Sequence, residues 1–165
     1  MTKRRKPARK TRTPNAHLEE QVFVSLIRTA DALTRKAEAL LKPAGLSGTQ
    51  YNILRILRGA GEGGLACGEI GDRLISRDPD LTRLLDRMES RELIARSREL
   101  KDRRVVKTRI TAEGQRILRD LDEPVQNLHR KQLLRLSEKQ LRQLLLLLEQ
   151  ARAQVEAQET PERLS

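Results

Sequence analysis

The sequence predicts a mainly helical fold that carries one small β-hairpin. Several long segments place apolar residues every three or four positions, which is the spacing of one buried helical face. Ser, Asp or Pro stands where several of these segments begin, and such residues favour helix starts. Between residues 93 and 110, by contrast, two short runs suit extended strands joined by a basic loop.

The first helix is expected at residues 17–42. Apolar and small side chains form a continuous stripe along it, and Pro43 and Gly45 end it. Residues 1–16 are basic and rich in Pro and Thr, without apolar periodicity, so we expect a disordered arm there. That arm either follows DNA phosphates or serves as a solubilising tail.

A second helix is expected after Ser47, whose side chain caps it with Gln50 as the capping-box partner. The glycine-rich stretch at 59–64 ends this helix. We expect a turn there, because the stretch lacks the GxxxxGK[ST] spacing of a phosphate loop. A short helix at 67–75 follows, with its apolar residues facing inward.

The next helix is expected to start with Asp78 as its cap and Pro79 in its first turn. One face of this helix is apolar and consists of Leu81, Leu84, Leu85 and Met88. The opposite face is polar and consists of Asp80, Thr82, Arg83, Asp86 and Arg87. Two short helices at this spacing form a helix-turn-helix.

Two short strands are expected next, Leu93–Arg98 and Val105–Ile110. The loop between them, residues 101–104, carries three basic side chains and one acidic one. A polar-faced helix beside a hairpin with arginines at its tip can enter one groove of a duplex and reach the next. The sequence therefore predicts a winged helix-turn-helix and, as the leading hypothesis, DNA binding.

Two helices are expected in the C-terminal part. One restarts at Thr111 and Glu113. Ser137 caps a last helix that extends to about Val155, with Gln140 at the capping-box position. Five consecutive leucines, 144–148, surround the last helix with apolar surface, of which one chain can bury only one face. We therefore expect an obligate homodimer in which the first helix and the two C-terminal helices of each chain interlock.

The composition supports a polyanionic partner. The chain has 34 Lys and Arg against 23 Asp and Glu, a formal net charge of +11, which favours nucleic acid first and an acidic membrane surface second. Phe23 and Tyr51 are the only aromatic residues. Proteins bind single strands by stacking the bases on aromatic side chains. Because aromatic side chains are nearly absent here, double-stranded DNA is the expected partner.

The sequence lacks the residues that several other classes of protein require. One cysteine makes no intramolecular disulfide and no cysteine-based metal cluster, which fits a reducing cytoplasm. No apolar run is long enough to span a membrane, so we expect a cytoplasmic protein. Two isolated histidines do not make a metal site, no catalytic set is recognisable, and neither an enzyme nor a bound cofactor is expected.

Three stretches resemble the MarR family of bacterial transcriptional regulators. Residues 46–54, LSGTQYNIL, are similar to its "LTxxQ…vL" helix, residues 81–89, LTRLLDRME, to its recognition helix, and residues 102–114 to its wing motif "DxR…LTxxG". The resemblance implies a homodimer that binds pseudo-palindromic operators, usually as a repressor, and that is often released by a small ligand or oxidant. Where the family usually has Gly, this chain has Glu92, at a position that often needs a left-handed backbone.

We expect residues 79–91 to lie in the major groove. The resemblance places Thr82 and Arg83 at groove-facing positions, where Arg83 binds guanine or clamps a phosphate and Thr82 touches a thymine methyl or a phosphate. Arg87 either reaches the DNA backbone or pairs with a neighbouring carboxylate. Secondary phosphate contacts are expected from Ser47, Ser76, Arg77 and Lys107.

Asp102 and Arg104 match the wing motif. Asp102 repels phosphate, so its expected role is to tighten the turn and pair with an arginine. Arg104, with Arg103 as second choice, is expected in the minor groove, where a narrow A/T tract concentrates negative potential. The competing interpretation is a solvated hairpin tip.

An effector site follows only from the resemblance. Family members bind amphipathic acids or phenols between the dimer helices and the DNA-binding lobe, which makes His17, Arg28 and Tyr51 candidates for that site. The competing interpretation of His17 is an ordinary surface histidine. Cys67 begins the third helix but does not match the N-terminal cysteine of the family's peroxide sensors, so redox sensing is the disfavoured interpretation.

The expected organisation is a basic arm, a dimerisation helix, a winged helix-turn-helix lobe, C-terminal dimerisation helices and a tail, at residues 1–16, 17–45, 46–112, 113–158 and 159–165. The predicted function is sequence-specific transcriptional regulation, with repression as the expected sign. The alternatives are a sequence-tolerant architectural protein for double-stranded DNA, which uses backbone contacts, and a module that binds another protein.

Overall fold

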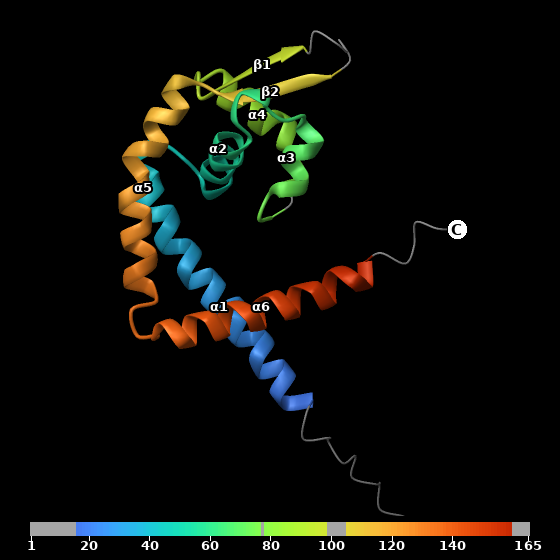
Figure 1. Ribbon diagram of the computed structural model, residues 1–165, viewed down its shortest axis with the longest axis vertical. Helices are drawn as coiled ribbons and strands as arrows, with labels where there is room; N and C mark the ends of the chain where they lie inside the picture. Colours follow the sequence, from blue (N-terminus) through green and yellow to red (C-terminus); the bar gives the residue numbers. More distant parts are fainter. Residues whose placement is uncertain (1–15, 77, 99–104, 160–165) are drawn as a thin grey trace, which may run out of the picture. The chain divides into compact units, whose positions relative to one another are not determined.

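The computed structural model describes residues 16–76, 78–98 and 105–159. In chain order (Figure 1), its elements are α1 (Ala16–Leu41), the 3-10 turn η1 (Lys42–Ala44), α2 (Gly48–Ala60), the 3-10 turn η2 (Gly61–Gly63), α3 (Cys67–Arg73), α4 (Leu81–Glu89), β1 (Ile94–Arg98), β2 (Val106–Ile110), α5 (Ala112–Gln132) and α6 (Glu138–Glu159). Helices predominate, and β1 and β2 pair as one antiparallel hairpin, so the predicted fold class is confirmed. The chain divides into two compact units, Met1–Pro124 and Val125–Ser165.

Both predicted capping boxes begin their helices. At α2 the backbone N–H of Ser47 donates to Gln50 Oε1 at 3.0 Å, and the Gln50 N–H donates to Ser47 Oγ at 3.2 Å. At α6 the Ser137 N–H donates to Gln140 Oε1 at 2.9 Å, and the Gln140 N–H donates to Ser137 Oγ at 3.4 Å. Side chains therefore satisfy backbone groups that a helix end leaves without partners.

The start of α4 differs from the prediction. The helix begins at Leu81, so Pro79 precedes it rather than standing in its first turn. Asp78 caps a turn instead of the helix, because its Oδ1 accepts the backbone N–H of Asp80 at 2.9 Å. Aspartate favours this local bond to the N–H two residues on, and the bond occupies the oxygen that was predicted to cap the helix. The preceding helix is also shorter than predicted, ending at Arg73.

The core of the first unit is aliphatic and is drawn from most of its elements. Its buried side chains are Leu41, Leu46, Ile53, Leu54, Leu57, Leu65, Ile70, Leu84, Leu85, Met88, Leu93, Ile94, Leu118 and Leu121. Burying one such side chain contributes about 1.5–3 kcal/mol. Because Leu84, Leu85 and Met88 of α4 belong to this core, the opposite face of α4 is held toward solvent.

The hairpin pairs in register from Ile94 opposite Ile110 to Arg98 opposite Val106. A further bridge, which the sequence did not predict, pairs Leu65 with Thr108 through hydrogen bonds of 2.8 and 3.0 Å. Gly64 permits this approach, since its φ is 63° and a Cβ there would lie 2.7 Å from the Thr108 carbonyl oxygen. The glycine-rich turn thus connects the base of the wing to the helical core.

The turn after α4 has the left-handed residue that the resemblance indicated. Glu92 has a φ of 56° and is the one non-glycine residue with positive φ among those described. The Glu92 N–H donates to the Glu89 carbonyl at 2.8 Å, and the Leu93 N–H donates to the Met88 carbonyl at 3.0 Å. This is a Schellman arrangement, in which glycine is usual, so Glu92 adopts a strained conformation here.

The second unit contains the end of α5 and the whole of α6, which extends past the predicted end near Val155 to Glu159. Four consecutive leucines of α6 are exposed: Leu144, Leu145, Leu146 and Leu147. Among the described residues, no helix combines the length and the apolar character that crossing a membrane requires.

Candidate DNA interface

The exposed face of α4 carries the residues predicted to enter the major groove. Thr82, Arg83 and Arg87 are exposed, while the other side of the helix is buried. The Arg83 side chain is 81% exposed, and its Nε lies 3.6 Å from Asp80 Oδ1. An exposed pair of this length contributes little, so Arg83 can exchange Asp80 for a DNA group at small cost.

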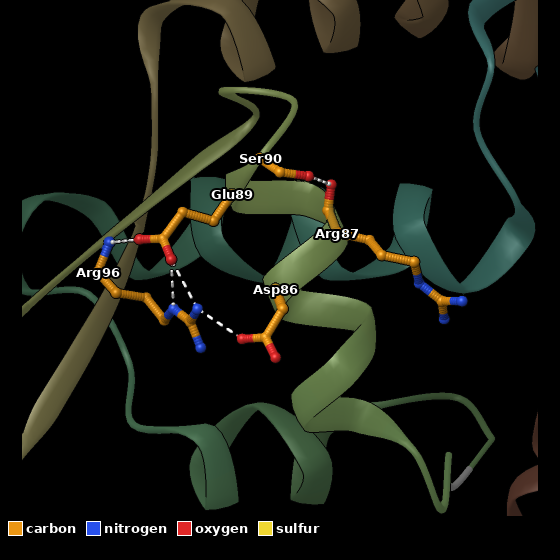
Figure 2. Close-up of polar contacts among 5 residues, drawn as sticks. All are labelled: Asp86, Arg87, Glu89, Ser90 and Arg96. Atoms are coloured by element: carbon orange, nitrogen blue, oxygen red, sulfur yellow. Dashed lines mark hydrogen bonds and ion pairs between the residues drawn. The ribbon is translucent and has the colours of Figure 1, made fainter.

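Among the described residues, Arg87 pairs with no neighbouring carboxylate, which was the competing interpretation. Figure 2 shows its side chain extending away from Asp86 and Arg96, and its guanidinium makes no ion pair with the described residues. Its carbonyl oxygen accepts the Ser90 hydroxyl at 2.9 Å, which stabilises the last turn of the helix. Arg87 is therefore a second exposed cation on α4, four residues after Arg83.

Asp86 and Glu89 of α4 pair with Arg96 of β1, forming what we call the Arg96 cluster (Figure 2). Arg96 Nε and Nη2 donate to Glu89 Oε2 at 2.9 and 2.6 Å, and Nη2 also donates to Asp86 Oδ1 at 2.6 Å. The hydrogen bonds from Arg96, with its positive charge, lower the pKa of Glu89. Sequence reasoning missed this cluster, and the opposite charges seven and ten residues apart were its only signal.

The wing is also attached to α3. Lys107 Nζ of β2 donates to Glu69 Oε2 at 2.8 Å, and the same oxygen accepts the Ala66 N–H at 2.7 Å. The Lys107 side chain is 20% exposed, and its hydrogen bond to Glu69 is the first cause of the lowered Glu69 pKa. This contact gives Lys107 a structural partner beside the phosphate contact predicted for it.

The other residues predicted to contact phosphate have different surroundings. The Ser47 hydroxyl caps α2, and Ser76 is exposed in the turn between α3 and α4, next to Ile75, whose N–H donates to Asn52 Oδ1 at 3.0 Å. Outside the described residues lie Arg77, Asp102, Arg103 and Arg104.

Comparison with known proteins identifies this arrangement. The model of the MarR family matches residues 46–106, from α2 into β2. A crystal structure of a MarR transcription factor from Planctomyces limnophilus is 39% identical, with a TM-score of 0.62, and the alignment covers 79% of this chain and 94% of that one. The chain belongs to the MarR family. It is a DNA-binding transcriptional regulator of that family.

Two further relatives are also transcriptional regulators. The HTH-type transcriptional regulator FarR of Neisseria gonorrhoeae is 27% identical over 112 residues, which is 68% of this chain and 75% of FarR. A mutant MarR from E. coli, solved in complex with operator DNA, shares the fold with a TM-score of 0.72 at 24% identity, covering 79% of this chain and 93% of that one. These relatives are regulators rather than enzymes, in agreement with the prediction that this chain is not an enzyme.

The MarR resemblance also suggested an effector site, whose candidate residues lie on two helices. His17 and Arg28 border one shallow depression along α1, where His17 Nδ1 and Gln21 Nε2 are 3.0 Å apart. Tyr51 lies on α2, with the Arg55 guanidinium 5.9 Å from its ring centre, and does not line that depression. Cys67 is exposed at the start of α3. Within the described ranges, no three His, Cys, Asp or Glu side chains form a group able to hold a metal ion.

Proposed function

We propose that this MarR-family protein binds a pseudo-palindromic operator as a homodimer and represses transcription until a small effector releases it. The proposal rests mainly on the orientation of α4. Its apolar face is buried, and its solvent face presents Thr82, Arg83 and Arg87, a set suited to base edges and phosphates in a major groove. The two-fold symmetry of a dimer would match inverted half-sites about one helical turn, roughly 34 Å, apart.

Exposed apolar side chains support the homodimer. On α1 they are Leu18, Val22, Phe23, Val24, Leu26 and Ile27. On α6 they are Leu144, Leu145, Leu146, Leu147 and Val155. Soluble monomers rarely expose contiguous apolar surface of this kind, so a second copy of the chain is the proposed cover for both helices.

Further DNA contacts are proposed for the wing and for other side chains of residues 46–112. Arg104, with Arg103 as second choice, is assigned to the minor groove, and Asp102 to the structure of the wing turn. Phosphate contacts are assigned to Ser47, Ser76, Arg77 and Lys107. A regulator of this kind needs access to the chromosome, so a cytoplasmic location is part of the proposal.

The effector site is assigned to His17, Arg28 and Tyr51, and an amphipathic acid or phenol is the proposed class of ligand. The cationic Arg28 suits the acid group of such a molecule. The domain organisation proposed with this function places dimerisation in residues 17–45 and 113–158, and DNA binding in residues 46–112.

Fluorescence anisotropy across a salt series tests the proposal. Two labelled duplexes of equal length are each titrated with the protein. One comes from the region upstream of its own gene, and the other has a random sequence. We expect the random duplex to bind roughly 10³-fold more weakly. Equal affinities with a steep salt dependence would instead support the architectural alternative, in which only the DNA backbone is contacted.

A further inference from the structure

The Arg96 cluster connects the two elements that the proposed function places on DNA. Glu89 and Asp86 lie on α4, and Arg96 lies on β1 of the wing. Figure 2 shows these three side chains turned toward one another, while Arg87 extends the other way from the same helix. The cluster is thus separate from the cations that α4 presents to solvent.

Three donors of Arg96 converge on one carboxylate. The backbone N–H donates to Glu89 Oε1 at 3.0 Å, while Nε and Nη2 donate to Oε2 at 2.9 and 2.6 Å. A carboxylate bound by a backbone group and by the planar guanidinium together is fixed in both position and orientation. The Arg96 side chain is 25% exposed, less than Asp86 at 54% or Glu89 at 37%, so the contact is partly shielded from solvent.

The charges of the cluster oppose DNA binding if they act alone. Asp86 and Glu89 place two negative charges on a helix proposed to approach phosphates, and such charges repel DNA. Arg96 offsets part of this repulsion, but its Nε and Nη2 already donate to the two carboxylates. A role for these residues in recognition must therefore be geometric.

We infer that Arg96 is a positioning residue for operator recognition. Its bonds to Glu89 hold β1 at one angle to α4, so the recognition helix and the wing meet the two grooves of a duplex as one rigid unit. This inference rests on the proposed function, and it extends that function to residues that do not touch DNA. Asp86 provides a second carboxylate that keeps the Arg96 side chain extended along α4.

The inference predicts opposite effects on two kinds of DNA. Glu89→Gln removes a negative charge from the DNA-facing lobe, so binding to random duplex becomes tighter. The same change replaces the charged carboxylate that accepts three hydrogen bonds from Arg96 with a neutral amide, so the wing is held less firmly and binding to the operator becomes weaker, by roughly tenfold. Electrostatics alone cannot give effects of opposite sign.

Glu92→Gln is the matched control. Glu92 lies three residues after Glu89, and its carboxylate makes no hydrogen bond or ion pair with the described residues. This substitution removes the same charge without touching the cluster, so it is expected to tighten binding to both duplexes by the same factor. Arg96→Lys keeps the charge of Arg96 but cannot make the forked contact, so it is expected to weaken operator binding while leaving random binding unchanged.

The experiment is fluorescence anisotropy with the full chain at one salt concentration. The probes are a duplex enriched from a random pool by in vitro selection with the wild-type protein and a random duplex of equal length. Each variant is first checked by circular dichroism and thermal melting, and all titrations are run at least 15 °C below the lowest melting midpoint, roughly the margin needed to keep every variant folded. The readout is the ratio of the two affinities, which a loss of stability alone would not change.

The outcomes separate the possible roles. A ratio that falls in Glu89→Gln and Arg96→Lys but not in Glu92→Gln supports the positioning role. Equal tightening of both duplexes by Glu89→Gln overturns it, as does equal weakening of both by Arg96→Lys, which would make Arg96 a phosphate contact. If no selected duplex binds the wild-type protein better than random DNA, the proposed function itself fails, and that result is distinguishable from the failure of the positioning role.

Discussion

At the scale of single residues, the polar face of α4 separates into two kinds of side chain. Arg83 and Arg87 extend into solvent, whereas Asp86 and Glu89 are bound by Arg96 of the wing. Periodicity identified the exposed face but not this division, because the partner of Glu89 lies on another element. The consequence is that the two arginines are available to DNA while the nearby carboxylates are not free to pair with them.

Arg83 and Arg87 are expected to differ in what they read. Arg83→Ala should weaken operator binding by about 1–3 kcal/mol and relax the preference for one base pair. Arg87→Ala should weaken binding to all sequences alike and reduce the slope of log affinity against log salt by about 0.9, the value for one lost phosphate contact. Salt-series anisotropy with operator variants measures both quantities, and each variant is the control for the other. Identical salt slopes in the two variants would contradict this assignment.

Glu92 is the residue where local strain is most directly testable. Glu92→Gly should stabilise the fold by up to about 1 kcal/mol, because glycine adopts positive φ freely. Glycine also makes the unfolded chain more flexible, which offsets part of this gain. Glu92→Ala keeps the Cβ and should give no comparable gain. Urea denaturation of the three proteins measures the difference. A glycine variant less stable than the alanine variant would rule out strain at this turn.

At the scale of elements, the start of α5 is held against the turn that follows α4. The Thr111 hydroxyl donates to the Glu92 carbonyl at 2.6 Å and accepts the Gly114 N–H at 3.1 Å. The Thr111 N–H donates to the Leu93 carbonyl at 3.2 Å. These bonds join the end of α4, the wing and α5 at one point, and they involve both the Thr and the Gly of the "LTxxG" pattern.

Gly114 is expected to tolerate no side chain. A Cβ at this position would lie 2.3 Å from the Leu93 carbonyl oxygen and 2.9 Å from Ile110 Cγ1. Gly114→Ala should therefore cost about 1–3 kcal/mol of stability, since the first turn of α5 must move. Gly59→Ala in α2 is the control, because nothing lies within 4 Å of its Cβ position, and it should be neutral or stabilising. Thermal and urea unfolding compare the two, and equal melting midpoints would refute the close contact.

A second link between elements gives a pH dependence. Arg58 of α2 donates to both carboxylate oxygens of Asp122 of α5 at 2.8 Å, and these hydrogen bonds lower the pKa of Asp122, with a smaller effect of the nearby Arg55 charge. Because the folded pKa lies below the unfolded one, the stabilisation is complete above the unfolded value, about 3.9, and is lost as the pH falls through the folded value.

Asp122→Asn should therefore destabilise the protein at pH 7 and have a diminishing effect as the pH is lowered below about 4. Urea unfolding of wild type and variant at several pH values measures the difference in unfolding free energy. Asp31→Asn serves as a control, because Asp31 pairs with Arg35 within one exposed helix and should matter little at any pH. A difference that grows toward acid pH would have the wrong sign for this contact.

At the scale of the whole molecule, two helices carry apolar surface that the described chain leaves exposed. Leucines of α6 and aliphatic side chains of α1 account for most of it. Burial in a homodimer removes this surface from water, which is the physical reason for proposing a dimer.

Light scattering coupled to size-exclusion chromatography should therefore give twice the chain mass of 18.9 kDa at micromolar concentration. Replacing Leu145 and Leu146 together by Lys should shift the mass toward one chain and abolish operator binding. Arg142→Lys, on the same helix, should leave the mass unchanged. A wild-type mass equal to one chain would contradict the dimer and the two-fold operator with it.

The amino-acid sequence by itself determined the order of the helices, the two capping boxes, the two strands of the hairpin and the winged helix-turn-helix fold. These follow from short-range rules: apolar periodicity, side-chain caps and turn residues act within a few positions. The cap at Asp78 was predicted wrongly because two local hydrogen bonds compete there, one to the helix and one to its own turn. The tertiary structure alone decided which polar groups meet across elements: Arg96 with Glu89, Lys107 with Glu69, Arg58 with Asp122 and Leu65 with Thr108. These pairs form because the aliphatic core brings distant segments of the chain together. The spacing of two residues along the chain does not say how close the core brings them.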